Sequence, residues 1–204
     1  GQFFLNLKFK FMSVAMINEP QVKRIHPHKF TMWIAMGSIC MMFAGFTSAY
    51  IVKKNQSNFL EFSLPIIFWY STAVILLSSL TIQLAVKSFK ARERKQYKTL
   101  ITITAFLGVL FAALQVFGFR DLESHGIYLT GPNSNAAASF ILIIVGMHAL
   151  HVLAGVVALL TLFVRAFASR SKNYSVTPIE IVSTYWHFVD ILWIYLLIFF
   201  VWIR

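Results

Sequence analysis

The segment "IVSTYWHFVDILWIYLLIFFVWI" at residues 181–203 decides the fold. It is almost entirely aliphatic and aromatic, and about 20 such residues cross the roughly 30 Å hydrocarbon core of a bilayer as one helix. Four more stretches reach that length, at 31–52, 65–88, 99–119 and 136–164. Over the whole chain 58% of residues are hydrophobic, 12% are charged and the mean hydropathy is +0.72, which excludes an ordinary soluble domain. The sequence therefore predicts an all-α integral membrane protein, a bundle of five transmembrane helices.

The basic residues fall unevenly on the two sides of these predicted spans. Of the 18 Lys and Arg, all but four lie in the N-terminal segment, between the second and third spans, or before the last span. The four on the opposite side are Lys53, Lys54, Arg120 and Arg204. Because cytoplasmic loops carry the excess of positive charge, we expect a cytoplasmic N-terminus and a C-terminus outside. This asymmetry explains the net charge of +11 without a nucleic-acid partner.

This pattern predicts one helical domain preceded by an N-terminal segment. Residues 1–30 are predicted to form a cytoplasmic N-terminal segment, and residues 31–204 the five-helix membrane domain. The single cysteine, Cys40, lies inside an apolar span, so neither a disulfide framework nor a cysteine metal site is expected. Nothing in the sequence pairs a nucleophile with a base or forms a phosphate-binding loop. The chain by itself is not expected to be a complete enzyme.

Only four ionisable residues lie well inside the spans: His148 and His151 in "GMHALHVLAG" (146–155), and His187 and Asp190 in the last span. Each pair is three residues apart, so its members share nearly one face of a helix. An ionisable group costs a few kcal/mol near the bilayer centre and usually faces the bundle interior. Because a short loop joins the last two spans, we expect these helices to be antiparallel neighbours, with Asp190 paired to a histidine across their interface.

The residues alone leave several roles open for these side chains. They could be hydrogen-bonding groups between helices, or a proton or ion pathway in a small transporter. A b-type haem is a third alternative; it would need His187 opposite His148 or His151, since two histidines on one helix face cannot hold a haem from both sides. Copper or zinc would need three or four converging ligands.

Other polar and small residues are interpreted as architecture. Gln115 is predicted to hydrogen-bond to a neighbouring helix, and Trp186 to serve as an interfacial anchor near the end of its span. Small residues permit close helix packing. We expect this of "FAGF" (43–46) and of Gly146 and Gly155.

Three motifs carry a resemblance to a known family. "FAGF", "GMHALHVLAG" and "YWHFVDILWIYLLIFF" (185–200) occur in this order, and they resemble segments of subunit III of the haem-copper terminal oxidases, in the five-helix form of bacterial cytochrome c and quinol oxidases. The resemblance runs from about His28 to the C-terminus. It implies a multi-pass protein of the bacterial plasma membrane.

The resemblance also implies a function. Subunit III is a non-catalytic partner of subunit I, and of subunit II, in a proton-pumping respiratory complex. The partner subunits hold the haem and copper, and subunit III supports assembly and proton uptake and binds phospholipid in a cleft. The resemblance implies no catalytic, metal or redox-cofactor residue in this chain. It implies structural or lipid-cleft roles for six residues: His148, His151, His187, Asp190, Gln115 and Trp186. Cytochrome c is the expected electron donor, with quinol as the alternative.

One position departs from the family pattern. Many members carry an intramembrane glutamate one turn before "FAGF", and this chain has Ile39 there. A function that needs that carboxylate is therefore not expected. Longer members have seven helices, and the sequence here predicts five.

Overall fold

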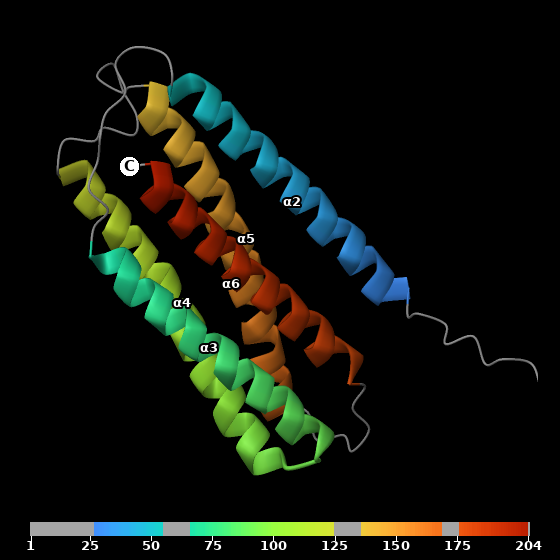
Figure 1. Ribbon diagram of the computed structural model, residues 1–204. Coiled ribbons are helices and arrows are strands. Elements are labelled where there is room, and N and C mark those ends of the chain that lie inside the picture. The colour runs from blue at the N-terminus through green and yellow to red at the C-terminus, as the bar shows by residue number, and fades with distance from the viewer. Residues whose placement is uncertain (1–26, 55–65, 125–135, 169–175, 204) are drawn as a thin grey trace, which may run out of the picture. The chain divides into compact units, whose positions relative to one another are not determined.

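A computed structural model describes residues 27–54, 66–124, 136–168 and 176–203 (Figure 1). These residues form five helices, each with a segment long and apolar enough to cross a membrane, and contain no strand. The helices are α2 (Pro27–Lys54), α3 (Ile67–Lys90), α4 (Arg94–Ser124), α5 (Ala136–Ala168) and α6 (Thr177–Ile203). The prediction of an all-α protein with five membrane helices is confirmed.

The chain divides into two units, Gly1–Thr31 and Met32–Arg204. In the first unit the structure describes only the beginning of α2, where the Thr31 hydroxyl donates to the Pro27 carbonyl at 3.1 Å. Most of the predicted cytoplasmic N-terminal segment, residues 1–26, lies outside the described residues. The site considered below belongs entirely to the second unit.

The helices extend beyond the apolar stretches that predicted them. α2 begins at Pro27 instead of residue 31, and α6 at Thr177 instead of residue 181. Proline is well suited to the first turn of a helix, where its missing N–H has no intrahelical partner to lose. Hydropathy marks the section of a helix that fits the hydrocarbon core, whereas backbone hydrogen bonding continues through flanking polar residues.

The turn between α3 and α4 is much shorter than the predicted connection over residues 89–98. Arg92 adopts a left-handed conformation with φ 61°, its N–H donates to the Phe89 carbonyl at 3.1 Å, and the Glu93 N–H donates to the Ser88 carbonyl at 3.0 Å. These two bonds are those of a Schellman motif, in which glycine is the usual left-handed residue. Arg92 takes this place here, so the sequence offered no glycine to locate the turn within the polar stretch.

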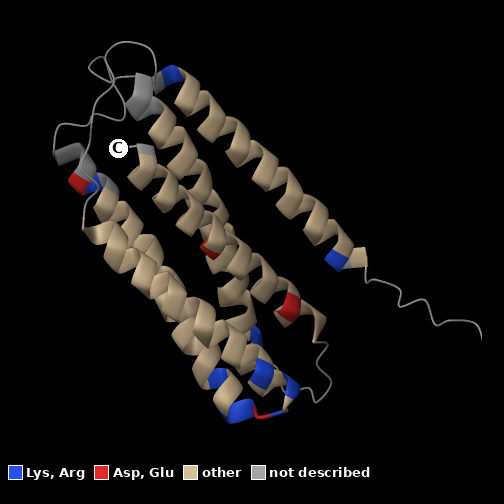
Figure 2. Cartoon of the chain, in the orientation of Figure 1, with Lys and Arg blue, Asp and Glu red and all other residues tan. Residues whose placement is uncertain are grey.

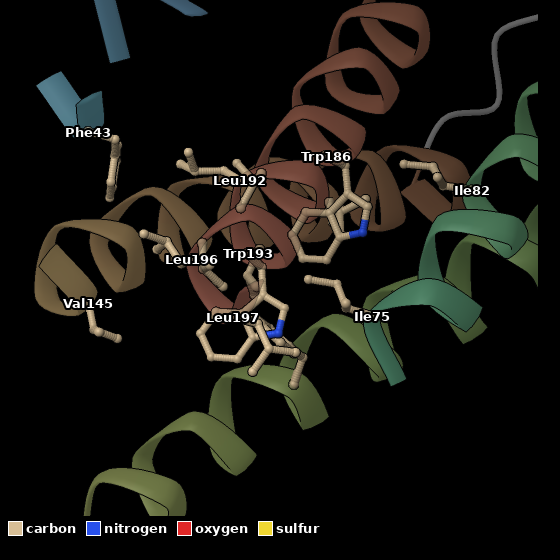
Figure 3. Close-up of a cluster of buried hydrophobic side chains, with 14 of the residues drawn as sticks. Phe43, Ile75, Ile82, Val145, Trp186, Leu192, Trp193, Leu196 and Leu197 are labelled. Atoms are coloured by element: carbon tan, nitrogen blue, oxygen red, sulfur yellow. The ribbon is translucent and has the colours of Figure 1, made fainter. Parts of the chain in front are cut away.

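α3, α4, α5 and α6 pack against one another, with α4 between α3 and α5, and α6 against α3 and α5. Figure 3 shows Trp186 and Trp193 of α6 among aliphatic side chains, including Ile75 and Ile82 of α3. Both tryptophans are buried, and both isoleucines are fully inaccessible. The core is therefore centred on the inward face of α6.

α2 is attached to the other helices through side chains, and its described backbone makes no close approach to theirs. The Thr47 and Tyr195 hydroxyls share a hydrogen bond of 2.9 Å, and the Tyr50 and Phe199 rings meet edge to face at 5.7 Å. Ile39 is partly buried and packs against the core.

Charged residues are confined to the helix ends among the described residues, with one exception in a helix interior. Figure 2 shows Lys and Arg gathered at the end of the bundle where α3 turns into α4. At that end Lys90 and Glu180 join α3 to α6 through an ion pair of 2.8 Å. The exception is Asp190, in the middle of α6 and only 2% exposed.

Candidate functional site

The polar face of α6 is directed at α3. The Trp186 indole N–H donates to the Ser78 hydroxyl at 3.1 Å, and the Trp193 N–H donates to the Thr72 hydroxyl at 3.0 Å. Small hydroxyl side chains let the two backbones approach while accepting these bonds. The two tryptophans therefore fix both the distance and the rotation of α6 relative to α3.

His187 extends this hydroxyl-bonded row. Its Nδ1 lies 2.6 Å from the Ser79 hydroxyl oxygen, and its Nε2 has no hydrogen-bond partner among the described residues. Ser79 also lies beside Asp190. Neither Asp190 carboxylate oxygen, however, makes a hydrogen bond within the described chain.

The predicted pairing of Asp190 with a histidine across the α5–α6 interface is therefore wrong. The physical reason is the rotation of α6, whose His187 and Asp190 are both next to Ser79 of α3. The helices are neighbours as predicted, but their polar faces point to different partners.

The histidines of α5 lie in an aromatic environment. His148 is 1% exposed and stacks on Trp193 with ring centroids 5.4 Å apart. The Phe43 ring of α2 meets His148 and His151 edge to face at 6.5 and 6.0 Å. His151 Nδ1 lies 2.7 Å from the Met147 carbonyl oxygen one turn earlier, whereas neither ring nitrogen of His148 has a hydrogen-bond partner in the described residues.

The four ionisable residues consequently form two separate groups. His148 and His151 contact α2, and His148 also contacts α6. His187 and Asp190 lie at Ser79 on α3. Across the described ranges, no group of three or more His, Cys, Asp or Glu side chains could hold a metal ion.

Gln115 of α4 behaves as predicted. It is 5% exposed, and its Nε2 donates to the Ser71 hydroxyl of α3 at 3.2 Å. Ser71 directly precedes Thr72, which accepts the Trp193 N–H, so α3 binds α4 and α6 through neighbouring residues. Thr81 and Thr104 add a second hydroxyl contact between α3 and α4, at 2.9 Å.

Trp186 occupies the centre of the four packed helices and is not the interfacial anchor that the sequence predicted. Its side chain is fully inaccessible. A Cβ built on Gly108 of α4 would lie 3.0 Å from its ring, and one built on Gly155 of α5 would lie 2.9 Å from it. Together with the bond to Ser78, these contacts place the indole ring against three helices at once.

The other small residues that were predicted to allow close packing do not do so. A Cβ on Gly146, or on Gly45 of "FAGF", would meet nothing within 4 Å. Gly155 alone of the two predicted α5 glycines makes the close approach, because it faces Trp186 whereas Gly146 faces open space.

Four hydroxyl residues of α3 were missed by sequence reasoning, although they provide most of the partners: Ser71, Thr72, Ser78 and Ser79. Their signal was present in "STAVILLSS" (71–79), where two pairs of small hydroxyls lie one heptad apart inside an apolar span. Such pairs on one face indicate a helix that accepts hydrogen bonds from its neighbours.

Comparison with known proteins identifies the family of this chain. A family model described as cytochrome c oxidase subunit III matches residues 56–204. The chain is 31% identical over 170 residues to cytochrome c oxidase subunit 3 of Bacillus sp. (strain PS3), covering 80% of each chain. It is 30% identical over 188 residues to the probable cytochrome c oxidase subunit 3 of Nocardia farcinica, covering 84% of this chain and 89% of the relative.

A relative of the quinol type is equally similar. The chain is 31% identical over 170 residues to cytochrome bo(3) ubiquinol oxidase subunit 3 of Pseudomonas aeruginosa, covering 81% of this chain and 79% of the relative. The family match spans well over half of the chain and includes α3, α4, α5 and α6. The chain therefore belongs to the cytochrome c oxidase subunit III family of haem-copper oxidase subunits.

Proposed function

We propose that this chain is a non-catalytic subunit that packs against subunit I of a proton-pumping haem-copper oxidase, in a complex that also contains subunit II. Family membership makes it a multi-pass membrane protein of a multisubunit oxidase. The family match over 56–204 is the observation that carries the proposal. We propose that the partner subunits hold the haem and copper, and that this chain supports the assembly and the proton uptake of those subunits.

The geometry of α6 supports a scaffolding role for the predicted site residues. Trp186 and Trp193 bond to α3, and His187 lies within hydrogen-bonding distance of Ser79. Each of these contacts joins two helices of the same chain. Substitution at these positions should therefore lower the stability of the subunit and its association with the complex, and should not directly change the rate of oxygen reduction.

A phospholipid is proposed beside α2, with His148 and His151 among its neighbours. The support is the attachment of α2 through side chains alone, which leaves its backbone apart from the other described helices. Both histidines lie on the α5 surface that Phe43 of α2 contacts. An acyl chain could follow this boundary without displacing a helix.

Cytochrome c is the proposed electron donor, in the plasma membrane of a bacterium. Two of the relatives above are named as cytochrome c oxidase subunits, and the relatives come from bacteria. Quinol is the second candidate, favoured by the similarity to the ubiquinol oxidase subunit of Pseudomonas aeruginosa. Oxygen consumption by the purified complex, measured with reduced cytochrome c and with a short-chain quinol, distinguishes the two donors.

The basic end of the bundle supports a cytoplasmic placement of the α3–α4 turn, and with it a cytoplasmic N-terminus. Among the described helix ends, this one carries the larger share of Lys and Arg (Figure 2), as the positive-inside rule requires. A cysteine placed at the exposed Arg92 should react with a membrane-impermeant maleimide only from the cytoplasmic side.

The proposed role is tested by preparing the oxidase with and without this chain. We expect the complex without it to reduce oxygen initially, and then to lose proton uptake and activity faster during turnover. His187→Ala should weaken retention of the chain in the complex. The control is Thr184→Ala on the same helix, which should leave retention unchanged because Thr184 is exposed and its hydroxyl donates to the Glu180 carbonyl of its own helix. Immediate loss of haem or of oxygen reduction without the chain would contradict a non-catalytic role.

A further inference from the structure

The turn between α3 and α4 presents a concentration of positive charge. Six basic residues lie between the last turn of α3 and the first turns of α4: Lys87, Lys90, Arg92, Arg94, Lys95 and Lys98. Glu93 is the acidic residue within this stretch, and Glu180 of α6 is paired with Lys90 at 2.8 Å. The charge at this end is therefore well in excess of what the described carboxylates balance (Figure 2).

Lys98 lies deeper than the rest of this cluster. It follows the start of α4 by about one helical turn, which is roughly 6 Å along the axis, and it lies inside the span Arg94–Gly118. Its ammonium group is held over the Phe167 ring of α5, 4.9 Å from the ring centroid, and has no carboxylate partner among the described residues. A lysine at such a depth extends its head group to the membrane interface, where it meets lipid phosphates.

The surface below Lys98 is aromatic and then aliphatic. Phe163 and Phe167 form a ring pair with centroids 4.9 Å apart, and the Phe167 side chain is 53% exposed. Farther into the membrane, Phe106 of α4 and Val164 of α5 are exposed on helices that pack together. The charged group thus stands at one end of two packed helices that expose apolar side chains farther into the membrane.

Lys95 provides a second ammonium group for the same place. It is exposed and precedes Lys98 by three residues, which places both on one face of α4. Two lysines next to one another favour a head group with a net negative charge over a zwitterionic one, whose own cation balances the phosphate, because each lysine adds attraction for an anionic lipid at the membrane surface.

We propose that Lys95 and Lys98 bind the phosphate of an anionic phospholipid whose acyl chains lie along the exposed apolar residues of α4 and α5. The exposed apolar side chains on the same two helices favour a lipid over an acidic segment of a protein, which would need no acyl-chain surface. This site is separate from the phospholipid proposed beside α2, since Phe167, under Lys98, follows His151 by 16 residues along α5, which is roughly 24 Å.

The test compares two lipids on the full-length chain in mild detergent. Dioleoyl phosphatidylglycerol or dioleoyl phosphatidylcholine is titrated, and the bound fraction is measured by native mass spectrometry. The wild-type chain should bind the phosphatidylglycerol more tightly. The Lys95→Gln/Lys98→Gln variant should lose that preference, by about fivefold in affinity for each lysine removed, while phosphatidylcholine binding stays unchanged.

Lys87→Gln is the matched control, because it removes one exposed charge from the same end of the bundle but on α3. It should reduce phosphatidylglycerol affinity less than twofold. Equal binding of the two lipids by the wild-type chain would overturn the proposal, and so would an effect of Lys87→Gln as large as that of Lys95→Gln alone. Should the double variant fail to fold, the wild-type lipid preference and the exposed single variant Lys95→Gln decide the question.

A protein ligand would be recognised in the intact oxidase. If Lys95→Gln/Lys98→Gln released a partner subunit while phosphatidylglycerol binding by the free chain stayed unchanged, the cluster would be a protein contact and the lipid proposal would be wrong.

Discussion

Replacing Gly155 by alanine tests whether the Trp186 ring determines how the four packed helices fit together. The added methyl carbon would lie 2.9 Å from the Trp186 Cε3 and Cζ3 atoms, closer than such carbon atoms approach in folded proteins. The ring cannot easily retreat, because its N–H is bonded to Ser78 and its opposite edge faces Gly108 of α4. The helices α5 and α6 must therefore separate to admit the methyl group.

The size of the effect is a balance of two terms. Overpacking of a well-packed core typically costs about 1–3 kcal/mol, whereas Gly→Ala within a helix gains about 1 kcal/mol from helix propensity. We expect Gly155→Ala to lower the free energy of unfolding by up to about 2 kcal/mol. Gly146→Ala on the same helix, where the methyl group meets nothing within 4 Å, should retain the propensity gain and be neutral or stabilising.

Unfolding of the purified chain in mixed micelles of mild detergent and dodecyl sulfate, followed by circular dichroism, measures these differences. The double variant Gly155→Ala/Trp186→Phe adds a coupling test, since the smaller ring removes the clash. The loss of unfolding free energy in the double variant should be smaller than the sum of the losses in the two single variants by at least about 1 kcal/mol. Equal stabilities for Gly155→Ala and Gly146→Ala would refute the reasoning.

Three further substitutions have defined outcomes in the same unfolding assay. Arg92→Gly should stabilise the chain by about 0.5–1 kcal/mol, because glycine adopts the left-handed conformation of this residue without steric cost; a destabilised variant would show that Arg92 makes a necessary contact. Ser79→Ala should destabilise the chain by about 1–3 kcal/mol, because His187 Nδ1 loses its hydrogen-bond partner, and an unchanged stability would indicate that this bond contributes nothing. Asp190→Asn should be neutral or stabilising, since the carboxylate is 2% exposed and has no hydrogen-bond partner within the described chain; a loss above about 1 kcal/mol would show that the charge is needed.

The number and type of helices could be predicted because lipid imposes a simple requirement. A chain that crosses hydrocarbon must satisfy its own backbone hydrogen bonds, so five long apolar stretches predict five helices. Gln115 was predictable for a related reason, since a buried amide needs a partner and a neighbouring helix is the nearest source. Neither inference depends on how the helices rotate.

Rotation about the helix axis is what the sequence could not supply. The spacing of His187 and Asp190 correctly placed them together, but their direction depends on Trp186, whose ring fits against Gly155 and bonds to Ser78. That fit turns their face toward α3 and away from the α5 histidines. The α3–α4 turn was missed for a comparable reason, because Arg92 occupies a position that glycine usually marks.

The central claim, that this chain is a non-catalytic subunit of a haem-copper oxidase, is tested most directly by purifying the complex in mild detergent through a tag on this chain. Haem, copper and cyanide-sensitive oxygen consumption are measured before and after the chain is dissociated from its partners. The account predicts that haem, copper and oxygen reduction all remain with the partners and that the separated chain is colourless. Haem retained by the separated chain, or a tagged chain that purifies without any haem-containing partner, would contradict it.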